Sequence, residues 1–321
     1  MKTPLLDLHR KHANLSRHYT IAIADKLQAA GYAHTPSTPS RLLTRINSQF
    51  LTHYVGRPPK WRLAMRGIVR SRTLPDFCLI GSAKCGTSDL AVSMMTHPNI
   101  IPPFAKEFWS SDPHSWKIFY PTERQKRAHA LRDGASMSPY CVPALHHMDI
   151  AYRLSRVKPN AKIVIVIREP IARLHSYWKW EMLLLGKRYA ESLPSFSTFE
   201  GYVEMSLSAY GYYPGFAPCS ARGIETSIYW KAVDYWLKCF GNDNVMVLDA
   251  GEYFTTRTSV LQRIQEFVGL PYVELPASSK AIFANPLPTH VPNTECAERL
   301  RQFFKPHNER LWEVIGKTFV W

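Results

Sequence analysis

The sequence predicts an α/β protein with three layers, in which helices flank a central, mostly parallel sheet, together with a helical N-terminal extension. Three short apolar runs, at residues 77–80, 162–167 and 245–248, have the composition of strands that are buried on both faces. Stretches with helical periodicity separate these runs, and this alternation is typical of a parallel sheet. A chain of 321 residues, 45% of them hydrophobic, is long enough to bury such a core.

The extension is predicted over residues 1–73 and the main domain over residues 74–321. Residues 1–33 and 41–54 have helical character, and the proline- and serine-rich residues 35–40 have the composition of a linker between them. Basic residues follow at broadly helical spacing between 60 and 72. They form either a solvated face or a surface that docks an acidic polymer or a membrane.

Within the main domain, the strand at 162–167 is the clearest, because five of its six residues are Ile or Val. Residues 112–134 mix aromatic and basic side chains and are predicted to be helical and to lie on the surface. Residues 138–140 and 194–218 are predicted to be loops. The remaining helices are predicted to begin at Thr87 and to span 148–157, 226–240, 260–268 and 298–315, the last interrupted near Pro306.

The charge of the chain indicates an anionic partner. Forty Lys and Arg stand against 25 Asp and Glu, a formal net charge of +15. An excess of this size suits a nucleotide cosubstrate, an acidic polymer, nucleic acid or a lipid headgroup.

Six cysteines occur without a C-x-x-C pair, which argues against a zinc site. The N-terminus lacks the apolar core of a signal peptide, and no apolar run is long enough to span a bilayer.

The first candidate site is the loop between the strand at 77–80 and the helix that begins at Thr87. Two glycines bracket this loop, and a lysine lies inside it. Main-chain amides, a helix N-terminus and an ammonium group together make a phosphate cradle. In the usual ATP or GTP loop the lysine follows the second glycine, so this loop is P-loop-like but differs from that motif. An ordinary strand-to-helix turn is the alternative. The loop and first helical turn comprise Gly81, Ser82, Ala83, Lys84, Cys85, Gly86, Thr87 and Ser88.

The second candidate site follows the central strand. Arg168 lies directly after that strand, at the edge of a parallel sheet where ligands bind, and Ser176 lies on the next helix. A guanidinium group can bind a phosphate through paired hydrogen bonds, and a serine can add a hydroxyl. Alternatively, Arg168 pairs with Glu169 and only caps the sheet edge. Two phosphate sites on two strands of one sheet suit a nucleotide phosphorylated at both ends.

Together the two motifs resemble those of sulfotransferases that use 3′-phosphoadenosine 5′-phosphosulfate (PAPS), of the type that includes Golgi carbohydrate sulfotransferases and their bacterial relatives. The resemblance covers residues 74–316. It implies that the loop from Gly81 to Ser88 binds the 5′-phosphosulfate and that Arg168 and Ser176 bind the 3′-phosphate. It also implies that Lys280 lies in a basic loop that closes over the nucleotide, and that no metal is required.

The same resemblance implies a mechanism. Lys84 stabilises charge on the leaving phosphate, and Glu107 is the general base that takes a proton from the acceptor. Lys106, Trp109 and Trp178 are predicted to contact the acceptor, whose choice the segment 194–218 shapes. In the alternative interpretation Lys106 and Glu107 form a surface ion pair. The rival bases are His114, His146 and His147.

The expected function is therefore transfer of a sulfuryl group from PAPS to a hydroxyl or amine, with a carbohydrate as the expected acceptor and a small metabolite as the alternative. Asp89 departs from the family pattern by placing a negative charge close behind the cradle. A P-loop kinase-like phosphotransferase is the runner-up, because Asp249 ends a strand where a metal-binding carboxylate would lie. Nucleic-acid binding ranks third. The chain is expected to be soluble and cytoplasmic, or to lie in the Golgi lumen if an N-terminal anchor was removed; membrane association is not expected from this chain.

Overall fold

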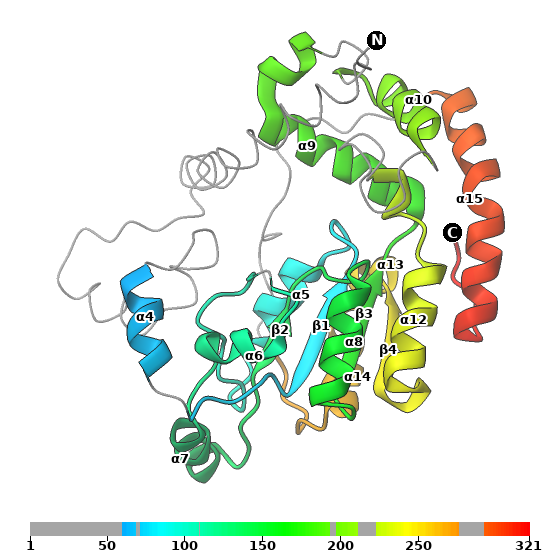
Figure 1. The fold of residues 1–321 in the computed structure, drawn as a ribbon. Helices are drawn as coiled ribbons and strands as arrows, with labels where there is room; N and C mark the ends of the chain where they lie inside the picture. The colour runs from blue at the N-terminus through cyan, green and yellow to red at the C-terminus, as the bar shows by residue number, and fades with distance from the viewer. Residues whose placement is uncertain (1–59, 69–70, 109, 193–196, 211–222, 276–291) are drawn as a thin grey trace. The chain divides into compact units, whose positions relative to one another are not determined.

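The structure is a computed structural model that describes residues 60–68, 71–108, 110–192, 197–210, 223–275 and 292–321. The described residues form two compact units (Figure 1). The sheet unit comprises described residues within Thr35–Arg168, Lys231–Ala284 and Val314–Trp321, and the helical unit comprises those within Glu169–Trp230 and Asn285–Glu313. The helical stretches predicted at 1–33 and 41–54, and the linker between them, lie outside the described residues.

The sheet unit contains four parallel strands in the order β2-β1-β3-β4. The α/β prediction is therefore confirmed. The three predicted strands are β1, β3 and β4, and β3 has the predicted ends. The strands are β1 (Phe77–Gly81), β2 (Pro139–Cys141), β3 (Lys162–Ile167) and β4 (Val245–Asp249).

Strand β2 corrects the prediction of a loop at 138–140. Pro139 pairs with Phe77 and Cys141 pairs with Leu79 in parallel register. A proline is tolerated there because it is the first residue of an edge strand, where a missing donor costs least. The strand is too short for its pattern to be recognised in the sequence.

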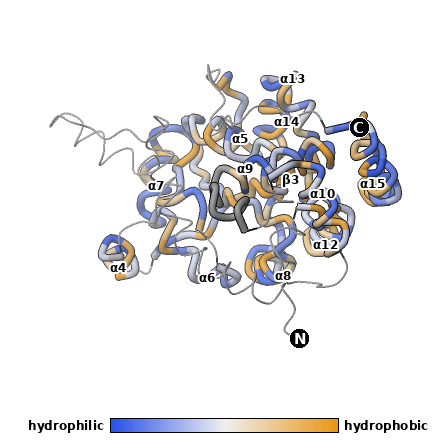
Figure 2. The backbone as a smooth tube through the Cα atoms, turned by 90° about the horizontal axis from the view of Figure 1, so that it is seen from above, coloured by the Kyte–Doolittle hydropathy of each residue, from blue (hydrophilic) through white to orange (hydrophobic). Residues whose placement is uncertain are grey.

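Helices cover both faces of the sheet (Figure 1). On one face a core cluster joins alternate side chains of β1 and β3, such as Leu79 and Val164, to α5 (Thr87–Met94), α13 (Ala250–Thr255) and α14 (Arg257–Val268). On the other face lie α8 (Met148–Val157) and α12 (Trp230–Phe240). The predicted helices at 148–157 and 260–268 are confirmed. Figure 2 shows β3 as hydrophobic and α7 (Glu123–Asp133) as largely hydrophilic, as expected for a buried strand and a surface helix.

Part of the basic segment packs against the sheet unit. It forms α4 (Lys60–Ile68). Arg66 donates hydrogen bonds to the carbonyl oxygens of Ile118 (2.6 Å) and Tyr120 (2.9 Å) and stacks 4.3 Å from the centre of the Phe104 ring. Burial and the neighbouring arginines lower the pKa of Arg66 to about 10. A purely solvated face is therefore wrong for Arg66. The predicted helical character of 112–134 is confirmed by α6 (Pro113–Trp116), the 3-10 helix η1 (Lys117–Phe119) and α7.

The helical unit has its own core. Figure 1 labels its helices α9 (Pro170–Ser192), α10 (Phe199–Ala209) and α15 (Thr294–Ile315), the last of which ends in the sheet unit. Helix α10 lies inside the stretch predicted as a loop and begins at a Thr198 cap, so that prediction is wrong for 199–209. Helix α15 runs through Pro306 without the predicted break. The core residues are Leu174, Trp178, Phe199, Tyr202, Val203, Ile224, Ile228, Cys296, Leu300 and Phe304.

Three further observations concern the described residues. The five described cysteines, Cys78, Cys85, Cys141, Cys239 and Cys296, are free thiols. Among the described helices, none combines the length and the hydropathy that crossing a bilayer requires. The short 3-10 helix η3 (Asn242–Asn244) completes the described elements.

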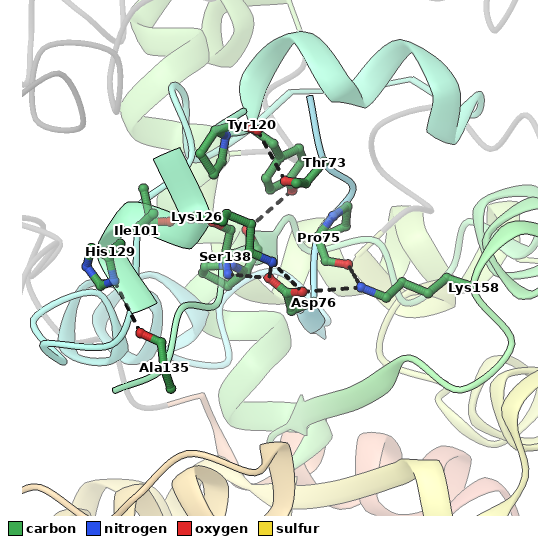
Figure 3. Close-up of polar contacts among 12 residues, drawn as sticks. Thr73, Pro75, Asp76, Ile101, Tyr120, Lys126, His129, Ala135, Ser138 and Lys158 are labelled. Atoms are coloured by element: carbon green, nitrogen blue, oxygen red, sulfur yellow. Dashed lines mark hydrogen bonds and ion pairs between the residues drawn. The ribbon is translucent and has the colours of Figure 1, made fainter. Parts of the chain in front are cut away.

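Asp76 joins three segments at the amino end of the sheet, as the convergence of side chains in Figure 3 shows. Its carboxylate accepts hydrogen bonds from the Lys126 ammonium group at 2.6 and 2.7 Å and from the Ser138 amide at 2.7 Å. The Lys158 ammonium group lies 3.5 Å away. Because these partners come from α7, the start of β2 and the turn after α8, Asp76 fixes the start of β1.

We expect Asp76→Asn to lower the free energy of unfolding by about 1.5–3 kcal/mol, the range for a hydrogen bond to a charged group. Chemical denaturation measures this change. Asp234→Asn is the matched control, because Asp234 pairs with Lys238 on the exposed surface of α12. Such surface pairs contribute about 0–1 kcal/mol. Equal effects of the two substitutions would contradict the role of Asp76.

Candidate active site

The carboxyl ends of β1 and β3 form the topological switch point of the sheet. The chain leaves β1 to form β2 on one side and returns to form β3 on the other. At this point of an open parallel sheet, the loops that follow the strands diverge and leave room for a ligand. The two predicted motifs follow these two strands.

Gly81 allows β1 and β3 to approach closely. It pairs with Val166, and a Cβ atom on Gly81 would lie 2.4 Å from the Val166 carbonyl oxygen and 2.9 Å from Thr87 Cγ2. The first of these contacts is with main chain, which cannot move away cheaply. Any side chain at position 81 would therefore separate the two strands or displace the start of α5.

The loop after β1 has the conformation of an anion cradle. Lys84 has φ 75°, the sole positive φ among described non-glycine residues, and Gly86 has φ 79°. Alternation of this kind turns successive main-chain amides toward one point. Gly86 is also the N-cap residue of α5, so the positive end of the helix dipole faces the loop. A Cβ atom on Gly86 would lie 2.8 Å from the Phe254 ring.

Arg168 lies beside this loop. Its guanidinium Nη1 is 3.5 Å from the carbonyl oxygen of Lys84. The structure therefore brings together the two motifs that are 84 residues apart in the sequence. In the helical unit, both carboxylate oxygens of Glu169 accept hydrogen bonds from the amides of Ile171 (2.9 Å) and Ala172 (2.6 Å), which caps the start of α9.

Lys106 and Glu107 belong to the same site. The Lys106 ammonium group donates a hydrogen bond to Ser88 Oγ (3.2 Å), in the first turn of α5, and forms an ion pair with Glu107. The side chain of Lys106 is 1% exposed, whereas that of Glu107 is 40% exposed. The alternative interpretation, in which Lys106 and Glu107 form a surface ion pair, is therefore wrong for Lys106, because its side chain is buried. A buried lysine here links the carboxylate of Glu107 to the first turn of α5.

A cluster of stacked aromatic rings holds the segment that carries Glu107. Phe108, the next residue, is buried and stacks on Phe119 with ring centres 4.0 Å apart. It also meets the edges of Trp116 and Tyr140, which stack on each other at 4.2 Å. Because Glu107 is exposed between buried neighbours, its carboxylate faces solvent from a rigid support.

Residues that are distant in the sequence compensate the charge of Asp89. Its carboxylate forms an ion pair with Arg257 and accepts a hydrogen bond from the Tyr253 hydroxyl at 2.5 Å. Burial and the hydrogen bond to Asp89 raise the pKa of Tyr253, so its hydroxyl remains a donor. These partners come from α13 and α14, more than 160 residues away. No local pattern in the sequence could have identified them.

Other predicted residues have different surroundings. Ser176 and Trp178 lie on α9 in the helical unit, where Trp178 is buried against His175 and Phe199. Trp109 and Lys280 lie outside the described residues. Among the rival bases, His114 is exposed on α6 and His147 is at the N-cap position of α8.

Asp249, on which the kinase alternative depended, has two hydrogen-bond partners. Its Oδ2 accepts a hydrogen bond from the Glu252 amide (3.0 Å), which caps α13, and its Oδ1 accepts one from Trp321 Nε1 (3.0 Å). This carboxylate supports a helix. Within the described ranges, no three His, Cys, Asp or Glu residues gather into a metal-binding group.

The described residues fit a nucleotide with phosphates at both ends. The loop offers main-chain amides, an αL turn and a helix N-terminus to one phosphate, and the guanidinium of Arg168 lies at the adjacent strand for another. Lys84 and Arg168 supply positive charge at this edge. The chemistry of this donor set suits an anion rather than an apolar ligand.

Comparison with known proteins identifies the family. The profile described as "Sulfotransferase domain" matches residues 74–285, more than half of the chain. Human heparan sulfate glucosamine 3-O-sulfotransferase 3A1 is 23% identical over 288 residues, which cover 83% of this chain and 67% of the relative. Human heparan sulfate glucosamine 3-O-sulfotransferase 5 is 21% identical over 83% of this chain and 79% of the relative.

The fold also matches a solved structure. The crystal structure of a sulfotransferase from Alicyclobacillus acidocaldarius superposes with a TM-score of 0.56, at 21% identity, and the match covers 77% of this chain and 98% of that chain. At this level of identity the similarity supports the α/β fold of the sheet unit, and the family assignment depends on the profile.

Proposed function

The chain belongs to the sulfotransferase domain family, and from this premise we propose that it transfers a sulfuryl group from PAPS to a hydroxyl or amine of a carbohydrate. Membership of this family implies PAPS-dependent sulfotransferase activity, class EC 2.8.2. Two observations favour the carbohydrate. The relatives named above are called heparan sulfate glucosamine sulfotransferases, and the net charge of +15 suits an acidic polymer. A small hydroxylated metabolite is the alternative acceptor.

The observation that carries the donor site is the approach of Arg168 to the Lys84 loop, at 3.5 Å. In this proposal the loop from Gly81 to Ser88 binds the 5′-phosphosulfate, and Arg168, with Ser176 of the helical unit, binds the 3′-phosphate. Lys280 is assigned to a basic loop over the nucleotide on the basis of family resemblance alone. The proposal needs both phosphate sites at one sheet edge, and the strand order β1-β3 supports this requirement.

The reaction is an in-line displacement at sulfur. When PAPS is bound, it supplies the sulfuryl group and a stable leaving group, 3′-phosphoadenosine 5′-phosphate (PAP). Glu107 accepts the proton of the acceptor hydroxyl while that oxygen forms its bond to sulfur, and Lys84 stabilises the negative charge on the departing phosphate oxygen. Lys106 contacts both Ser88 and Glu107, so it holds the base at a fixed distance from the cradle.

The direct test is transfer of labelled sulfate from PAPS to a panel of acceptors that contains N-sulfated and unsulfated glycans and small phenols and alcohols. We expect transfer to a glycan and a loss of about 100-fold or more in rate for Lys84→Ala, as when one charge-stabilising donor is removed. Transfer to small alcohols alone would replace the carbohydrate proposal with the metabolite alternative. Absence of transfer from PAPS to every acceptor would contradict the proposed reaction.

Glu107→Gln tests the base. Because the amide cannot accept the proton, we expect kcat to fall by about 100-fold to 10,000-fold, while the affinity for PAP stays within about twofold. Steady-state kinetics and calorimetric titration with PAP measure the two quantities. Glu123→Gln, at the exposed start of α7, is the control and should leave both unchanged. Normal turnover of Glu107→Gln would move the role of base to His146 or His147.

Arg168→Ala tests the 3′-phosphate site. We expect the dissociation constant for PAP to rise about 10-fold to 100-fold, since a hydrogen bond to a charged group contributes about 1.5–3 kcal/mol. The affinity for adenosine 5′-phosphate, which lacks the 3′-phosphate, should change by less than about threefold. Arg124→Ala, on the exposed face of α7, is the matched control. Equal losses for both nucleotides would place Arg168 elsewhere in the site.

A further inference from the structure

The negative charge of Asp89 opposes the binding of an anion at the proposed donor site. Asp89 is the third residue of α5, in the first turn of the helix whose N-terminus faces the loop. A carboxylate there opposes a bound dianion, because like charges a few ångströms apart repel each other and the repulsion grows as water is excluded. For the loop to bind a phosphate, the negative charge of Asp89 must therefore be compensated.

The compensating group is Arg257. Its guanidinium pairs with Asp89 Oδ2 and also donates a hydrogen bond to Ser93 Oγ, one turn further along α5. The two side chains are 25% and 14% exposed, respectively, so solvent screens this pair less than an ordinary surface pair. Arg257 thus contacts α5 at two points.

Helix α13, which lies just before Arg257 in the sequence, also supports the loop between β1 and α5. Tyr253 and Phe254 are adjacent residues of α13; Tyr253 donates its hydroxyl hydrogen bond to Asp89, and the Phe254 ring lies against the Cα side of Gly86. Asp249 caps the start of α13. Contacts with Asp89, Ser93 and Gly86 therefore tie α5 and its N-cap to α13 and to the first residue of α14.

We propose that Arg257 is a positioning residue for the donor nucleotide, which neutralises Asp89 and holds the first turn of α5 so that the loop keeps its positive potential. Tyr253 assists as a neutral hydrogen-bond donor. This inference rests on the proposed donor site. Arg257 acts through Asp89 and α5, and its effect is therefore expected on the affinity for the anionic nucleotide more than on the chemical step.

The test compares four chains by calorimetric titration with PAP at low and high salt. Arg257→Gln keeps a hydrogen-bond donor but removes the charge, so the dissociation constant should rise about tenfold, which corresponds to one close charge at a partly exposed site. Asp89→Asn alone should bind PAP as tightly as the wild type or tighter. The double variant should return to within about threefold of the wild type, because both charges are then absent.

Arg263→Gln is the matched control. Arg263 lies on the same helix and pairs with Glu252 of α13, away from α5, with both side chains more exposed. Its substitution should change the affinity for PAP by less than about twofold. In steady-state kinetics, Arg257→Gln should raise the KM for PAPS more than it lowers kcat.

The results separate the charge effect from a structural one. If Arg257 only stabilised the fold, the double variant would bind PAP no better than Arg257→Gln, and that result would overturn the proposal. So would wild-type affinity in a folded Arg257→Gln protein. If Arg257→Gln fails to fold, Asp89→Asn decides: a tenfold loss of PAP affinity in that variant contradicts the proposal. A wild-type chain that does not bind PAP would instead contradict the donor site itself.

Discussion

The close approach of β1 and β3 is the constraint on which the site depends. The two strands pair in parallel up to Gly81 and Val166, where a hydrogen atom is the largest side chain that fits beneath the Val166 carbonyl group. This contact places the end of β1 next to the end of β3, so the loop with Lys84 and the guanidinium of Arg168 emerge together. A glycine required for strand packing is thereby also required by the proposed nucleotide site.

Two carboxylates near the loop have basic partners. Asp89 pairs with Arg257 from a distant segment, and Glu107 pairs with its buried neighbour Lys106. A nucleotide with several negative charges can therefore meet a positive field although two carboxylates lie close by. The partially exposed Glu107 keeps access to solvent, and hence to an acceptor, while its partner remains buried.

The sequence predicted those features that short segments encode. Strand β3 has its predicted ends, because Ile and Val alternate with no polar interruption, and the Gly81–Ser88 loop was recognisable from glycine spacing. Strand β2 was missed because three residues hold no periodicity, and α10 because Ser, Gly and Tyr in its surroundings resemble a loop. Pro306 suggested a break in α15, although a long helix packed along one face tolerates a single lost hydrogen bond. The pairing of Asp89 with Arg257 exists only in the folded chain.

The contacts of Asp249 show why the local sequence pattern alone could not distinguish a sulfotransferase from a phosphotransferase. A carboxylate at the carboxyl end of a parallel strand is where a phosphotransferase holds its metal, which neutralises the charge on the transferred group. Here the same position caps α13 and contacts Trp321. A sulfuryl group carries one negative charge fewer than a terminal phosphoryl group, so in the proposed reaction a fixed cation such as Lys84 can match its charge. The aspartate then becomes available to support α13, and through Tyr253 and Phe254 that helix supports the loop that is proposed to bind the donor.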